Sequence, residues 1–98
     1  MKIVINNCYG GFSLSDEACE ALGLTNPYAT ISRCDPKLIE LVQTMGERIN
    51  GECAELAVAT IPDEATDWQI QEYDGVENVI YVLDGEIRYA YPDEEEDI

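Results

Sequence analysis

Carboxylates are the side chains best suited to chemistry in this 98-residue chain, and they concentrate in its C-terminal third. Residues 63–98 hold thirteen Asp and Glu residues against one Arg, and the whole chain carries a formal net charge of −16. The same stretch contains two Asp-Gly pairs between apolar runs, which is typical of β-hairpins. Because charge of one sign destabilises a folded sheet by self-repulsion, the acid is either tolerated for solubility or directed toward a basic partner.

Catalytic chemistry has little support in the sequence. The chain has no histidine, which removes the usual proton shuttle and the usual base of a nucleophile–base pair. No Asp/Asn pattern of a calcium loop occurs. The cysteines form no Cys-x-x-Cys motif and have no neighbouring base, so we expect free, mostly buried thiols at Cys8, Cys19, Cys34 and Cys53. We therefore predict no enzyme, no metal site and no cofactor.

Length and composition predict one small globular domain. Apolar residues make up 46% of the chain, which is ordinary for a folded protein, so its high charge does not indicate general disorder. We expect residues 1–92 to form a single domain and the acidic residues 93–98 to be a disordered tail. The pI of about 4.1 argues against direct binding of nucleic acid or anionic membranes. No apolar run reaches the roughly 20 residues of a membrane span, and we expect a cytoplasmic protein.

The order of expected elements predicts an α+β fold, with a small antiparallel (mixed) sheet of about four or five strands and two helices packed on one face. Ser15 and Asp35 are favourable N-caps, and Gly23 and Asn50-Gly51 are favourable stops, so helices are expected at about 16–22 and 36–49. Apolar and β-branched runs predict strands at 2–6, 54–61, 68–73, 76–83 and 86–91.

The glycine loop, residues 8–12 (Cys-Tyr-Gly-Gly-Phe), precedes the first expected helix, as phosphate-binding loops do. Here Asp16 and Glu17 begin that helix and would repel an anion, and no Lys follows the glycines. We interpret the segment as a loop that needs glycine to pass close to neighbouring backbone.

Two-residue turns fix the register of both hairpins. Around Asp84-Gly85, one face of the sheet carries apolar residues that we expect to be core against the longer helix: Ile80, Val82, Ile87 and Tyr89. Around Asp74-Gly75, Glu72 lies opposite Glu77, and the second face carries Trp68, Ile70, Val79 and Tyr81.

Three hairpin carboxylates break a local rule. Like charges directly opposite each other destabilise a ladder by up to about 1 kcal/mol, and Glu72 faces Glu77. Asp74 follows Glu72 at the roughly 6.7 Å repeat of an extended strand, a step comparable to that between successive phosphates. Either the array is kept for a partner or the acids are simply solvated at a hairpin tip. In both cases, neutralising all three is expected to raise thermal stability.

Three stretches carry a resemblance to known proteins: residues 2–15 (KIVINNCYGGFSLS), 35–40 (DPKLIE) and 72–77 (EYDGVE). They resemble a family of small, largely uncharacterised proteins encoded by bacteriophages and prophages. The resemblance implies no catalytic residues. It implies a setting in which small acidic proteins imitate DNA and occupy the basic groove of host defence proteins, as some anti-CRISPR and anti-restriction proteins do.

We therefore predict an acidic binding protein that imitates nucleic acid and blocks DNA recognition by a basic DNA-binding protein of the bacterial host, in the sharpest version a subunit of a CRISPR surveillance complex. The residues expected to bind are Asp63, Glu64, Asp67, Glu72, Tyr73, Asp74, Glu77, Asp84 and Glu86. One alternative is an adaptor that binds a basic protein without imitating DNA. Another is a small enzyme or ligand-binding domain centred on the glycine loop.

Overall fold

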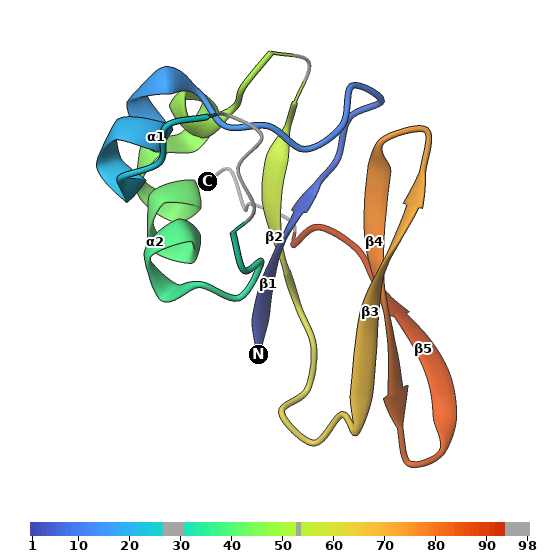
Figure 1. Cartoon of the computed structure of the whole chain (residues 1–98). Coiled ribbons are helices and arrows are strands. Elements are labelled where there is room, and N and C mark those ends of the chain that lie inside the picture. Colours follow the sequence, from blue (N-terminus) through green and yellow to red (C-terminus); the bar gives the residue numbers. More distant parts are fainter. Residues whose placement is uncertain (27–30, 53, 94–98) are drawn as a thin grey trace, which may run out of the picture.

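The computed structural model describes residues 1–26, 31–52 and 54–93, which form three layers (Figure 1). The elements are β1 (Lys2–Asn6), α1 (Asp16–Leu22), α2 (Pro36–Met45), a 3₁₀ helix η1 (Gly46–Ile49), β2 (Leu56–Thr60), β3 (Asp67–Tyr73), β4 (Val76–Leu83) and β5 (Glu86–Ala90). The α+β class is confirmed, but the strands divide between two antiparallel sheets, β1-β2 and β3-β4-β5.

The helix starts are as predicted. The Ser15 side chain accepts a hydrogen bond from the Ala18 amide, and the Asp35 side chain accepts from the amides of Lys37 and Leu38. The end of α2 differs from the prediction, because the α-helix stops at Met45 and not near Ile49. Gly46 adopts a φ of 60°, and the chain continues as the 3₁₀ turn η1. Gly46 therefore ends the α-helix one turn earlier than the stop expected at Asn50-Gly51.

The sheet β1-β2 is the middle layer. One of its faces packs on the helices, through a buried cluster that includes Val4, Val58, Leu38, Val42 and Ile49. Its other face packs on the three-stranded sheet through Ile3, Ile5, Ala59, Ile61 and Val79. Figure 1 shows the same order, with helices on one side of β1-β2 and β3-β4-β5 on the other. The apolar residues Ile3, Val4 and Ile5 of β1 are thus buried on both faces of the strand, as the apolar run predicts.

Both predicted hairpin registers are confirmed, including Glu72 opposite Glu77 and Val82 opposite Ile87. Asp74 and Gly75 have φ of 52° and 91°, and Asp84 and Gly85 have φ of 52° and 79°, as a type I′ turn requires.

The prediction of which sheet face is core was wrong. Trp68, Ile70, Val79 and Tyr81 face β1-β2, whereas Ile87 and Tyr89 on the opposite face are 67% and 53% exposed. The long helix contacts β1 and β2, which lie between it and the three-stranded sheet. The helix therefore has no access to the face that was assigned to it.

The C-terminal segment begins with a docked residue. The Asp93 amide donates to the Val58 carbonyl at 2.7 Å, and its carboxylate accepts from the Thr60 hydroxyl at 2.7 Å. Residues 94–98, the rest of the expected tail, lie outside the described residues. None of the helices in the described part of the chain is long and apolar enough to cross a membrane.

The thiols of Cys8, Cys19 and Cys34 are free, and Cys53 lies outside the described residues. Cys19 is buried in the helix-side core, and burial raises its thiol pKa, with the nearby Asp16 charge adding to the effect. Burial likewise raises the pKa of Cys34.

We expect native Cys19 to react with iodoacetamide at neutral pH at least about tenfold more slowly than in the urea-unfolded chain, because it is both enclosed and protonated. Peptide mass spectrometry at timed intervals measures this, with the partly exposed Cys8 as the internal control. Equal rates for Cys19 in the folded and unfolded chain would contradict the packing of α1.

Candidate functional site

The eight carboxylates predicted to bind a partner divide into two groups. Seven are exposed, as is the Tyr73 ring, which is 77% exposed. These seven are Asp63, Glu64, Asp67, Glu72, Asp74, Asp84 and Glu86. Glu77 is only 6% exposed. The assignment of Glu77 to a binding surface was therefore wrong, and its carboxylate is used inside the chain.

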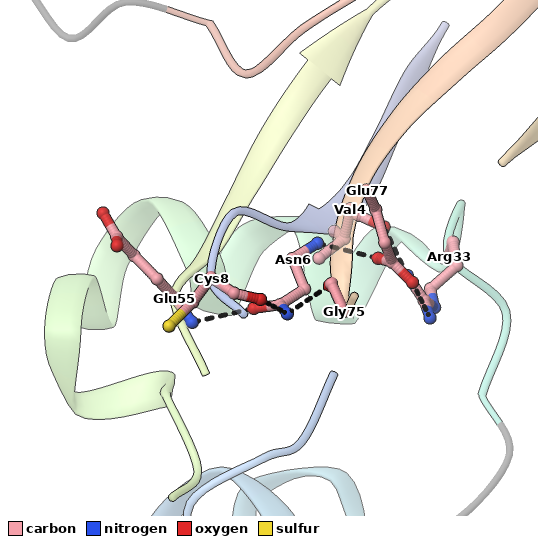
Figure 2. A network of polar contacts seen from close by, with 7 residues as sticks. All are labelled: Val4, Asn6, Cys8, Arg33, Glu55, Gly75 and Glu77. Atoms are coloured by element: carbon pink, nitrogen blue, oxygen red, sulfur yellow. Dashed lines mark hydrogen bonds and ion pairs between the residues drawn. The ribbon is translucent and has the colours of Figure 1, made fainter. Parts of the chain in front are cut away.

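Glu77 is the centre of a buried polar network (Figure 2). Arg33 Nη1 lies 2.7 Å from Oε1 and Nη2 lies 3.1 Å from Oε2, which is a bidentate ion pair. The backbone amide of Asn6 also donates to Oε1, at 2.8 Å. Charge-assisted and bidentate bonds of this kind are the strong ones, and they compensate for the loss of hydration of the carboxylate.

Arg33 is itself held from two further sides. Its Nη1 donates to the Val4 carbonyl at 3.2 Å, and its guanidinium carbon lies 3.8 Å from the centroid of the Phe12 ring, a cation–π contact. The Val4 amide in turn donates to the Arg33 carbonyl at 2.8 Å. The segment before α2 is thus fastened to β1, and Phe12 of the glycine loop packs on the same cation.

Asn6 extends the network to the first hairpin turn. Its Nδ2 donates to the carbonyls of Cys8 at 2.7 Å and Gly75 at 2.8 Å, and its Oδ1 accepts from the Glu55 amide at 2.9 Å (Figure 2). From the sequence, Asn6 is predicted only as the end of the strand at 2–6, and no role is predicted for Arg33. The available signal was an Asn directly after the apolar run Ile3-Val4-Ile5, since an amide at the end of a buried strand requires partners.

The glycine loop packs against this same turn. Tyr9, Gly10 and Gly11 line a shallow hollow together with Glu72, Asp74 and Gly75. A Cβ on Gly75 would lie 2.7 Å from both the Gly11 amide nitrogen and the Tyr9 carbonyl oxygen, so backbone meets backbone here. The close approach expected of the loop is present, but the glycine that it requires is Gly75 of the turn and not Gly11 of the loop, where a Cβ would meet nothing within 4 Å.

The predicted array of three exposed carboxylates, Glu72, Asp74 and Glu77, is not present in the structure. Glu77 is buried, and the positive φ of Asp74 ends the extended repeat at Tyr73, so the assumed strand spacing between Glu72 and Asp74 does not apply. Glu72 and Asp74 remain together on the rim of the hollow. No cluster of three or more metal-ligating side chains occurs among the described residues.

Two of the seven exposed acids have a cationic partner. Asp63 accepts from the N-terminal ammonium at 2.7 Å, and this hydrogen bond, together with the ammonium charge, lowers the pKa of its carboxyl group. Glu86 lies 3.1 Å from Arg88. Within residues 1–26, 31–52 and 54–93, no ion pair forms at the other five: Glu64, Asp67, Glu72, Asp74 and Asp84.

The chain matches no protein-family model, and comparison with curated proteins and with solved structures finds no significant match either. The function is therefore inferred from the positions and contacts of the residues of this chain.

Proposed function

We propose that this protein acts by binding, and that its exposed carboxylates occupy the basic surface with which a partner protein binds DNA. The observation that carries the proposal is the contrast between its acids. Among the described residues, the one buried carboxylate is neutralised within the chain, while five exposed ones on or beside the three-stranded sheet have no cation partner. A surface built to neutralise phosphates also accepts carboxylates, which Arg binds bidentately.

The acids gather at the two ends of the three-stranded sheet. Glu72 and Asp74 lie at the β3–β4 turn, whereas Asp67 at the start of β3 pairs with Val82, next to the opposite turn that holds Asp84. The seven residues of β3 separate these ends by roughly 20 Å. Two fixed groups of negative charge at that distance suit an extended basic groove better than a single cation.

The target in a bacterial host defence system is the narrower form of this proposal, and it depends on the resemblance of residues 2–15, 35–40 and 72–77 to phage proteins. The second candidate is an adaptor for a basic protein that does not imitate DNA. An enzyme or ligand-binding role at the glycine loop has less support, since the buried side-chain polar atoms of the described residues all have hydrogen-bond partners.

Affinity purification from a bacterial host, with the tagged chain as bait, supplies the partner for the test. We expect its affinity for the purified partner to fall steeply between low and high salt, and duplex DNA to compete. Partner binding that is indifferent to duplex DNA would favour the adaptor and contradict the mimic.

Neutralising Glu72 and Asp74 together, as Glu72→Gln with Asp74→Asn, is expected to weaken partner binding about tenfold at low salt, because two charges leave the surface. The matched control removes two exposed helix charges, Glu20→Gln with Glu40→Gln, and is expected to change the affinity less than about threefold. Isothermal titration at two salt concentrations measures both. Equal losses for the two pairs would show that net charge, and not the hairpin tip, sets the affinity.

A further inference from the structure

Among the described residues, the three-stranded sheet has a partly exposed apolar surface on the side away from β1-β2. We call this the outer face and define it by six residues: Tyr73, Val76, Ile80, Val82, Ile87 and Tyr89. Their positions in the ladder place them opposite to the set that packs on β1-β2. Tyr73, Ile87 and Tyr89 are more than half exposed.

The sequence of β4 is that of a strand covered on both sides. An antiparallel sheet with one solvated face normally alternates apolar and polar residues. In β4, Val79 and Tyr81 point to the inner side with Glu77, yet Val76, Ile80 and Val82 point to the outer side with Asn78 as the one polar residue of β4 there. Contiguous exposed apolar residues on a soluble protein are typical of an interaction site.

Charge decides what can cover this face. In a chain with 21 acids, the strand positions on the outer side include one, Asp67, and no cation. Further carboxylates lie at both turns, at Asp74 and Asp84. Three neutral amides, Gln69, Gln71 and Asn78, share this side with the apolar residues. The surface is therefore neutral, with Ile80, Val82, Ile87 and Tyr89 grouped on β4 and β5 and with acids at its edges.

A second copy of this chain is a poor occupant. It would bring two chains of net charge −16 together, with acidic edges facing acidic edges. The cations of the ion pairs are engaged elsewhere, Arg33 with Glu77, Arg48 with Glu17, and Arg88 with Glu86 on the inner side of β5. No cation of the outer side could offset the repulsion.

We propose that the outer face docks a partner protein through an apolar, aromatic-rich patch bordered by Lys and Arg. The inference rests on the proposed function for the basic character of the partner, and it adds the contact that anchors the complex. Interfaces commonly combine a desolvated apolar centre with a polar rim, and Tyr rings accept Arg guanidinium groups on their faces. The carboxylates attract and orient the basic partner, and the apolar contacts of Ile87 and Tyr89 slow its dissociation.

Two synthetic hexapeptides of equal charge test this on the intact chain: alternating Arg-Trp and alternating Arg-Ser. Amide chemical shifts of the ¹⁵N-labelled protein give both the site and the affinity. We expect the Arg-Trp peptide to shift amides across β3, β4 and β5 and to bind about tenfold more tightly than the Arg-Ser peptide, since only the former packs on the apolar residues of the outer face.

Ile87→Ser and Tyr89→Ser each remove an exposed apolar group, so folding should be little affected. Each is expected to weaken Arg-Trp binding about tenfold and leave Arg-Ser binding unchanged. Tyr9→Ser, which removes an even more exposed ring (77%) from the glycine loop, is the control and should leave both affinities within about twofold.

Three results would overturn the inference. Equal affinity for the two peptides, with shifts confined to the turns, would contradict docking on the outer face and would leave the proposed function unaffected. Failure of both peptides to bind at low salt would contradict both the docking on the outer face and the proposed function. A dimer in sedimentation velocity that Ile87→Ser converts to a monomer would show that a second copy covers the face.

Discussion

Replacing Glu77 with Gln is expected to lower the free energy of unfolding by about 3 kcal/mol, because it leaves a largely buried Arg33 without its counter-charge. The guanidinium would keep the Val4 carbonyl and the Phe12 ring, and the neutral amide oxygen of the new side chain could replace only one of the two charge-assisted bonds. Asn6 would also lose the charge on the acceptor of its backbone amide. This reverses, for Glu77, the sequence-based expectation that neutralising the three hairpin acids raises stability.

Urea unfolding followed by Trp68, the one tryptophan of the chain, measures the effect. The matched control is Glu72→Gln, which removes the same group from the residue directly opposite in the ladder. Because Glu72 is exposed, we expect its replacement to change the free energy of unfolding by less than about 0.5 kcal/mol. Similar losses for the two variants would contradict the assignment of Glu77 to a buried ion pair.

A double-mutant cycle measures the interaction energy between Arg33 and Glu77 separately from their contacts with other residues. Arg33→Met leaves Glu77 buried and unpaired, and the double variant with Glu77→Gln removes both charges. We expect the double variant to be more stable than the sum of the single losses predicts, by about 2 kcal/mol, as for neighbours in one network. Additive losses would show that the two residues stabilise the fold independently.

Local chemistry predicted much of this fold. Asp-Gly at two positions fixed both hairpins with correct partners, because a two-residue turn with positive φ leaves one register. Ser15 and Asp35 marked helix starts because an N-cap bond is made within three residues. These features depend on neighbours in the chain, which a sequence displays directly.

The errors come from long-range packing. Both faces of β4 are apolar, so alternation alone could not decide which of them β1-β2 would cover. The partner of Glu77 is Arg33, 44 residues earlier, and no local pattern connects the two. The exposure of acids on the turns could thus be predicted from local pattern, whereas the burial of Glu77 could not, because a segment distant in sequence encloses it.

Gly75 and Gly85 occupy the same position in the same type of turn but differ in their surroundings, so alanine at the two positions is expected to have different effects on stability. Gly85→Ala places a Cβ at a φ of 79° with nothing within 4 Å, so only backbone strain opposes it. We expect a loss of about 1 kcal/mol in the free energy of unfolding. Gly75→Ala adds a steric conflict with the backbone of Tyr9 and Gly11, and we expect a loss of about 3 kcal/mol.

The difference between the two variants isolates the contact between the glycine loop and the hairpin. Relief of the conflict requires the Gly75 turn to move from the loop, which would also disturb the bond from the Asn6 side chain to the Gly75 carbonyl. Amide shifts of residues 8–12 should therefore change in Gly75→Ala and stay constant in Gly85→Ala. Equal losses of stability with an unperturbed loop would contradict the close approach. Because Glu72 and Asp74 border that contact, Gly75→Ala should also weaken partner binding.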